Sequence, residues 1–226
     1  MKKHFLSTIF FFAICFQAFS QSFGPGMKLP KHTIMLGFGP GFMYADNGGR
    51  LTQFDFKTRP VFDLGYVYHL NPKVGIRATL GTQWLESNTQ VPDRTIEKWG
   101  EQNQAFAFSG TAYYFDIMPE ITFGDPYKRS PNRFYGGIGL GILQVYRTQQ
   151  TLIAERVVTK DAFTQTAYFP FRFGYSRQLN INWSAAAETS FFFTLSDDLD
   201  GNVGYNTFGN DYLFQFKVAI RRSLYN

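Results

Sequence analysis

Apolar and polar residues alternate with a period of two along eight segments of this chain. A period of two turns successive side chains to opposite faces of an extended strand, so each segment is predicted to be a β-strand with one apolar and one polar face. After residue 20 no run approaches the eighteen consecutive apolar residues of a membrane-spanning helix. The eight predicted strands are 32–44, 60–70, 74–85, 107–124, 133–147, 165–177, 181–194 and 211–224.

The apolar faces are rich in aromatic residues. In segment 60–70, Phe62, Leu64 and Tyr66 alternate with Asp63 and Gly65. Segment 32–44 would present one apolar face in the same way. Its predicted members are Ile34, Leu36, Phe38, Pro40, Phe42 and Tyr44.

The connections alternate between short and long. Asn71-Pro72 and residues 178–181 form tight turns, and 124–133 is of intermediate length. Short periplasmic turns and long outer loops are typical of bacterial outer-membrane barrels, and an even number of strands returns both termini to one side. We therefore expect an all-β fold, an eight-stranded antiparallel up-and-down barrel in the outer membrane. The expected long loops are 45–59, 86–106, 148–164 and 195–210.

The amino-acid composition indicates that the outer wall of this barrel contacts lipid. Aromatic residues make up 19% of the chain, with 27 Phe and 13 Tyr, yet they are spread singly among Gly, Ser, Thr and charges. This suits a wall that is apolar outside and polar inside. A soluble sandwich or a lipocalin-like barrel with inward aromatics is the alternative. The formal charge of +5 is scattered, so no nucleic-acid surface is predicted.

The N-terminus reads as a secretory signal peptide over residues 1–20, followed by the barrel over 21–226. Lys2 and Lys3 precede an apolar run over 5–16, and Ala18-Phe19-Ser20 fits a cleavage site. A retained anchor helix or a lipoprotein signal at Cys15 are the alternatives. Because Cys15 is the only cysteine, the mature chain is expected to have no disulfide and no thiolate site.

The polar face carries four acids and four bases. Charges confined in a narrow interior need partners, because a lone buried charge costs several kcal/mol. The pattern predicts an ion-pair network that closes the bore, and a narrow solute channel is the alternative. Inward glycines such as Gly37 and Gly137 are expected to make room for the long basic side chains. The predicted network residues are Asp63, Arg77, Asp116, Glu120, Arg172, Glu188, Lys217 and Arg221.

No catalytic or metal-binding constellation stands out. Asp116 and Glu120 would lie roughly 13 Å apart on one strand, too far for paired-carboxylate chemistry. His32 and His69 fall at the predicted periplasmic ends of strands, away from any Ser-His-acid set. The acidic segment 196–202 has the composition of a calcium-binding turn, but a solvated acidic turn is the expectation. We expect no enzymatic activity, no cofactor and no metal.

Several segments resemble a family of small Bacteroidetes outer-membrane barrels similar to PorG. The run ETSFFFTLSDDLDGN from Glu188, followed by DYLFQF from Asp211, is similar to that family's last hairpin. Residues 133–139 (RFYGGIG), the turn 71–77 and Pro119-Glu120 also match its pattern. The family's loop has Tyr where this chain has Asp198.

The resemblance implies a function in the outer membrane. It suggests a membrane anchor or assembly subunit that contacts lipid and the secretion-complex proteins of a type IX system. A surface recognition barrel using its long outer loops is the alternative, as is the narrow channel.

Overall fold

The computed structural model describes residues 30–50, 55–87, 91–124, 131–204 and 209–225. The predicted signal peptide, residues 1–20, lies outside this part of the chain. The strands are β1 (His32–Tyr44), β2 (Gly49–Arg50), β3 (Asp55–Phe56), β4 (Arg59–His69), β5 (Val74–Glu86), β6 (Ala105–Phe123), β7 (Asn132–Ile138), β8 (Leu140–Ile153), β9 (Arg156–Gln178), β10 (Trp183–Thr194) and β11 (Tyr212–Leu224), with one helix, α2 (Asp93–Glu101), in the described residues.

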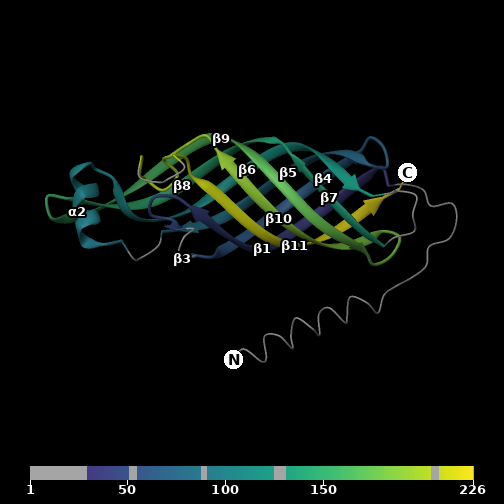
Figure 1. Cartoon of the computed structure of the whole chain (residues 1–226), viewed down its shortest axis with the longest axis horizontal. Coiled ribbons are helices and arrows are strands. Elements are labelled where there is room, and N and C mark those ends of the chain that lie inside the picture. Colours follow the sequence, from purple (N-terminus) through teal and green to yellow (C-terminus); the bar gives the residue numbers. More distant parts are fainter. Residues whose placement is uncertain (1–29, 51–54, 88–90, 125–130, 205–208, 226) are drawn as a thin grey trace, which may run out of the picture.

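The long strands form a closed antiparallel ring, as predicted. Each pairs with its neighbours in the chain, and β1 pairs with both β4 and β11. Strands β7 and β8 lie in line between β6 and β9, so the ring has eight positions. Figure 1 shows these strands crossing the molecule obliquely, as the tilt of a closed barrel requires. No helix among the described residues is long and apolar enough to span a membrane.

The break between β7 and β8 at Gly139 has a local cause. The Gly139 N–H donates to the Pro170 carbonyl (3.0 Å), but Pro170 has no N–H to donate in return. The register with β9 is unchanged across the break, since Ile138 pairs with Phe171 and Gly141 with Tyr168. Strands β7 and β8 therefore together form the predicted fifth strand, which lacks one main-chain hydrogen bond opposite Pro170.

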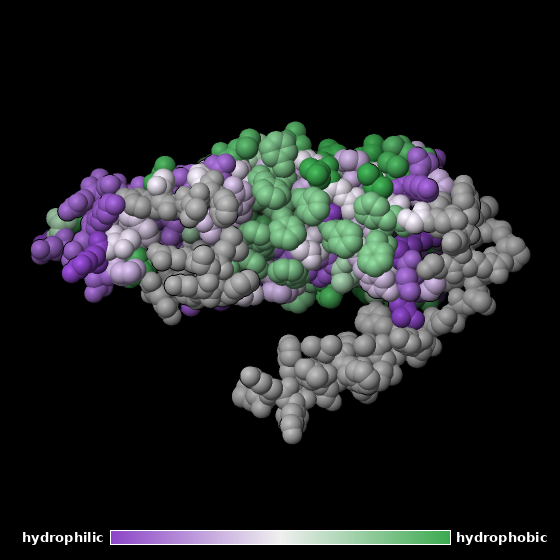
Figure 2. All heavy atoms as spheres, viewed as in Figure 1, coloured by the Kyte–Doolittle hydropathy of each residue, from purple (hydrophilic) through white to green (hydrophobic). Residues whose placement is uncertain are grey.

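The outer wall is apolar. Residues predicted to face outward are exposed along every long strand, including Leu36, Leu80, Ile117 and Val218. Figure 2 shows apolar side chains gathered across the middle of the visible face, between two more polar ends. A wall of this kind is stable only against lipid, because a soluble protein rarely exposes so large an apolar surface.

Tyr44 is an exception to the predicted outward face. Only 7% of it is exposed, and its ring stacks on Tyr212 at 6.1 Å. Nearby Phe42 is half-buried because β3 folds against this end of β1 and places Phe56 4.6 Å from its ring. The wall is therefore covered by protein at this rim.

The prediction of a long loop over 148–164 is wrong. Strands β8 and β9 continue as a hairpin to Ile153 and Arg156, and the two residues between them, Ala154 and Glu155, both have positive φ (48° and 61°). That conformation is typical of a tight two-residue hairpin turn. Polar residues on both faces hid this part of the strands, because Gln149 and Thr151 are polar although buried, opposite the exposed Thr148 and Gln150.

The predicted loop 86–106 contains helix α2. The helix follows Pro92, and Asp93 in its first turn favours the positive end of the helix dipole. Trp99 is buried, and Gly100 lies so close to Leu152 of β8 that an added Cβ would meet the Leu152 carbonyl oxygen at 2.3 Å. The helix and the β8–β9 hairpin therefore pack together; we call residues 91–105 and 145–164 the outer head.

Candidate functional site

The barrel interior brings all eight predicted charged residues together. They come from β4, β5, β6, β9, β10 and β11, and each is at least 94% buried. Glu188 lies at the centre. Its two carboxylate oxygens accept hydrogen bonds from the Arg77 guanidinium at 2.5 and 3.1 Å, and its Oε2 accepts a further one from the Tyr135 hydroxyl at 3.1 Å.

The remaining charges connect to this centre. Lys217 lies 3.3 Å from Glu188 and also pairs with Asp63. Arg77 lies 3.5 Å from Glu120, which accepts a hydrogen bond from Arg221 at 2.5 Å. The acids and bases therefore alternate along one chain of contacts, so that each charge has an opposite neighbour.

Arg172 and Asp116 form the second arm of the network. Arg172 donates to both oxygens of Asp116 at 2.5 and 2.7 Å, and its Nε lies 3.7 Å from Glu188. The Tyr168 hydroxyl donates to Asp116 at 2.6 Å, and the Thr79 hydroxyl accepts a bond from Arg172 at 3.0 Å. A bidentate pair with added hydroxyl partners is the geometry that offsets the cost of burying two charges.

Aromatic side chains fill the lumen next to the charges. The Phe192 ring lies 4.9 Å from that of Tyr114 and 4.6 Å from that of Tyr168, and the Arg172 guanidinium stacks 5.4 Å over it. The Arg221 guanidinium lies 4.4 Å over the ring of Tyr135. These aromatic residues were not among the predicted interior residues, although their positions on the polar side of the alternation would have placed them inside.

The glycines that were predicted to make room for basic side chains, Gly37 and Gly137 among them, lie against other groups, contrary to expectation. A Cβ on Gly37 would meet the Asp63 carboxylate at 2.2 Å, and one on Gly141 would meet the Tyr168 ring at 2.5 Å. A Cβ on Gly137 would lie 1.9 Å from the Pro119 carbonyl oxygen. These glycines leave room for acids, aromatic rings and the close approach of neighbouring strands.

The acidic segment 196–202 is not a solvated turn. Asp200 and Asn202 are fully buried, and the Asp200 carboxylate accepts hydrogen bonds from the main-chain N–H groups of Asn47 (2.8 Å) and Asn202 (2.9 Å). The side-chain amides of Asn47 and Asn202 both donate to the Ala105 carbonyl, at 3.1 and 2.6 Å. These hydrogen bonds link the segments that contain Asn47, Ala105 and Asp200. We call this buried, hydrogen-bonded cluster the knot.

Within the described residues, no group of three His, Cys, Asp or Glu side chains could hold a metal ion.

Burial raises the pKa of Asp200 to about 7; the main-chain hydrogen bonds from Asn47 and Asn202 oppose this increase, and the charge of Asp46 adds to it. Burial and the neighbouring Asp200 also raise the pKa of Asp211 well above its usual value. When the knot is closed, the carboxyl groups of Asp200 and Asp211 therefore stay protonated at a pH at which they would be ionised in the opened segment, where they lose their protons above a pH of about 4. The stability of the knot is greatest at low pH and falls as the pH rises to about 7.

Hydrogen exchange should detect this pH dependence. After correction for intrinsic rates, we expect the Asn47 and Asn202 amides to open more often at pH 7 than at pH 5, with up to about tenfold change per pH unit. Asp200→Asn should remove most of the change, and the Asn182 amide in the short turn between β9 and β10 is the internal control. Equal protection at both pH values in the unaltered protein would contradict the effect.

The two histidines form only local contacts. His69 lies 3.0 Å from the Thr33 hydroxyl, and His32 lies 2.6 Å from the Tyr66 hydroxyl. Neither contact includes a carboxylate or a serine, so the described residues provide no Ser-His-acid arrangement around them.

Solved structures with the same fold are outer-membrane barrels. Neisserial surface protein A aligns with a TM-score of 0.53 and 10% identity over 86% of this chain and 97% of its own. The attachment invasion locus protein Ail of Yersinia pestis, in complex with the heparin analogue sucrose octasulfate, aligns with a TM-score of 0.50 and 12% identity over 87% and 100%. This chain has the fold of the small outer-membrane β-barrels.

No family model and no curated protein sequence matches the chain. The resemblance to barrels similar to PorG therefore stays a prediction from sequence. The same holds for the signal peptide. The apolar wall and the shared fold together support a location in the outer membrane.

Proposed function

We propose that this protein is a non-enzymatic, non-conducting outer-membrane barrel that recognises a partner at the cell surface through its outer head. The observation that carries this proposal is the β8–β9 hairpin. Strand β10 stops pairing with β9 at Tyr168, whereas β8 and β9 stay paired out to Ile153 and Arg156. The hairpin therefore extends well beyond the opposite side of the barrel rim, and Figure 1 shows it projecting with α2 at one end.

The closed lumen supports the non-conducting part of the proposal. The eight charged side chains of the network and the rings of Tyr114, Tyr135, Tyr168 and Phe192 occupy the bore, all of them buried. An eight-stranded barrel has room for little more than such side chains. Function is then expected at the surfaces of the barrel and not along its axis.

The surface of the outer head favours a protein partner. Tyr146, Ile153, Val157 and Phe163 are each 41–59% exposed on the hairpin. Aromatic and aliphatic side chains of this kind form the anchors of protein interfaces. The charges on 91–105 and 145–164 are balanced, five basic against five acidic residues, so a polyanion such as a heparin analogue is not favoured.

Trimming the hairpin tests this function. We expect a variant in which 149–160 is replaced by Asn-Gly to insert and show normal heat-modifiable migration, while cells carrying it lose binding to the surface partner. The control is Val203→Ser, which removes an exposed apolar side chain outside the outer head and should leave partner binding intact. Unchanged binding by the trimmed protein would contradict recognition by the hairpin.

The role of membrane anchor or assembly subunit, including one in type IX secretion, is the second candidate. The same closed bore suits it, and its partners would meet the periplasmic turns. Two of these turns are ordered by asparagine side chains: Asn71 accepts from the N–H groups of Lys73 and Val74, and Asn180 from those of Asn182 and Trp183. Retention of periplasmic partners by both the trimmed and the unaltered protein would favour this role.

A further inference from the structure

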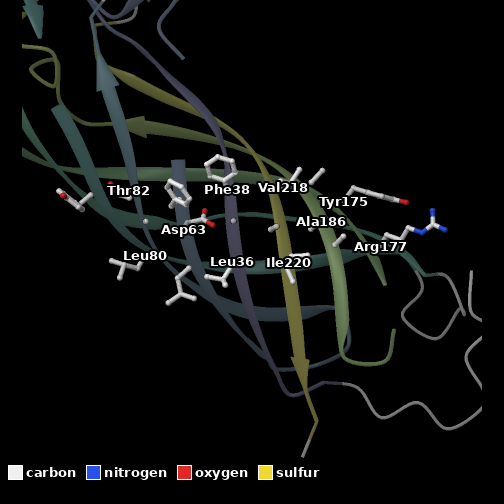
Figure 3. A pocket seen from close by; sticks show the side chains of 18 residues that line it. Leu36, Phe38, Asp63, Leu80, Thr82, Tyr175, Arg177, Ala186, Val218 and Ile220 are labelled. Carbon is white, nitrogen blue, oxygen red and sulfur yellow. The ribbon is translucent and has the colours of Figure 1, made fainter. Parts of the chain in front are cut away.

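A broad, shallow apolar hollow extends over the outer wall from β5 and β4 across β1 and β11 to β10 and β9, and its part over β10 forms a groove. Ala185 and Ala187 form its floor, because they are the small outward residues of this strand. Their register partners form its sides: Ile220 and Val218 on β11, and Arg177 and Tyr175 on β9. Figure 3 shows Tyr175 and Arg177 on one side of Ala186, and Val218 with Ile220 on the other.

Two arginines stand at one end of this groove. Arg177 and Arg222 occupy outward positions of β9 and β11, next to the tight turn that joins β9 to β10. Neither forms an ion pair with a carboxylate in the part of the chain that the structure describes. The Nε of Arg177 is buried without a hydrogen-bond partner, and the Arg222 guanidinium lies 5.4 Å over the ring of Trp183.

The positions of the two arginines allow them to bind one group together. Arg177 pairs with Ala185 and Arg222 with Trp183, so they flank β10 from opposite sides, two residues apart along the strand. Adjacent strands are about 4.8 Å apart, which places the two Cα atoms roughly 10–12 Å from each other. Two long side chains can span that gap and meet at a single phosphate, which guanidinium groups bind through paired hydrogen bonds.

We propose that this groove binds one anionic phospholipid of the periplasmic leaflet. Its phosphate contacts Arg177 and Arg222, and one acyl chain lies over Ala185 and Ala187 between the side chains of Tyr175 and Val218. The apolar floor matches an acyl chain, and the unpaired positive charges match the headgroup. Trp183, an amphipathic ring at the same level, fits the membrane–water interface.

Other occupants fit the groove less well. A second copy of this chain packed on the same face about a two-fold axis would bring four arginines together without an acid between them. Lipopolysaccharide carries phosphate in the opposite leaflet, whereas these arginines lie at the end with the short turns, which is the periplasmic end of such barrels.

Native mass spectrometry of the detergent-purified, full-length protein tests the proposal. The probes are dioleoyl phosphatidylglycerol and dioleoyl phosphatidylcholine, which share their acyl chains. We expect one phosphatidylglycerol to bind with about thirtyfold preference, on the order of what two basic side chains contribute at an anionic membrane surface. The double variant Arg177→Gln with Arg222→Gln should bind the two lipids equally.

Two further variants keep the test specific. Arg156→Gln with Lys160→Gln removes the same charge from the hairpin at the other end and should keep the preference. Ala187→Phe should weaken binding of both lipids, because the ring fills the groove. The proposal is overturned if the unaltered protein shows no preference, if the arginine variant retains it, or if lipopolysaccharide displaces the bound lipid more effectively than phosphatidylglycerol does.

Discussion

Glu188→Ala should destabilise the folded barrel more than any other single charge removal in the lumen. Glu188 contacts Arg77 at 2.5 Å, Lys217 at 3.3 Å and Arg172 at 3.7 Å, so its loss leaves three buried cations short of a partner. Breaking a buried ion pair in this way costs about 3–5 kcal/mol. The heat-modifiable gel shift should move to a clearly lower temperature, and the midpoint of urea unfolding in detergent should fall.

Matched variants separate charge from packing. Glu188→Gln keeps the volume and some hydrogen bonds but removes the charge, and should lie between the alanine variant and the unaltered protein. Glu155→Ala removes an acid from the exposed hairpin turn and should leave both measurements unchanged. An unaltered unfolding temperature for Glu188→Ala would show that the lumen charges do not stabilise the barrel.

Gly137→Ala should disrupt the barrel wall itself. The added Cβ would lie 1.9 Å from the Pro119 carbonyl oxygen, which belongs to the main chain of β6 and cannot rotate away. The strands must therefore move apart at the point where Pro119 and Pro170 already reduce the hydrogen bonding around Gly139. Overpacking costs about 1–3 kcal/mol where side chains can adjust, and we expect at least the upper end of that range here.

Gly65→Ala is the control for this prediction. It is also an inward glycine of the barrel wall, but its Cβ would meet only side-chain atoms: the end of Met35 at 3.2 Å, and Arg77 Nε and Met35 Cβ at 3.5 Å. Folding yield into detergent, read by the heat-modifiable shift, should fall strongly for Gly137→Ala and little for Gly65→Ala. Equal yields would mean that the β6–β7 contact is looser than its geometry indicates.

The failed prediction of a long loop over 148–164 has a physical reason. Within the membrane, lipid on one side and a packed lumen on the other impose alternation on every strand. In the extension of β8 the alternation of burial continues, with Thr148 and Gln150 exposed, but the buried face carries the polar residues Gln149 and Thr151, so no apolar–polar pattern is visible in the sequence. The hairpin persists because its backbone is fully paired and its residues are rich in β-branched side chains.

The acidic segment 196–202 shows a different limit. Its composition alone suits both a hydrated turn and a buried knot, since Asp and Asn serve in either. Burial of Asp200 depends on Asn47 and Ala105, which lie about one hundred residues or more away in the sequence. A single-sequence pattern carries no signal for contacts of that separation.

The sequence by itself determined which side of the wall each strand residue faces, because alternation follows directly from strand geometry. It also determined that Asp63, Arg77, Asp116, Glu120, Arg172, Glu188, Lys217 and Arg221 share the interior. Only the tertiary structure decided the partners. Closure of the ring and the tilt of its strands set which residues meet across the lumen, bringing Arg77 to Glu188 over 111 positions of the chain, and no local pattern contains that information.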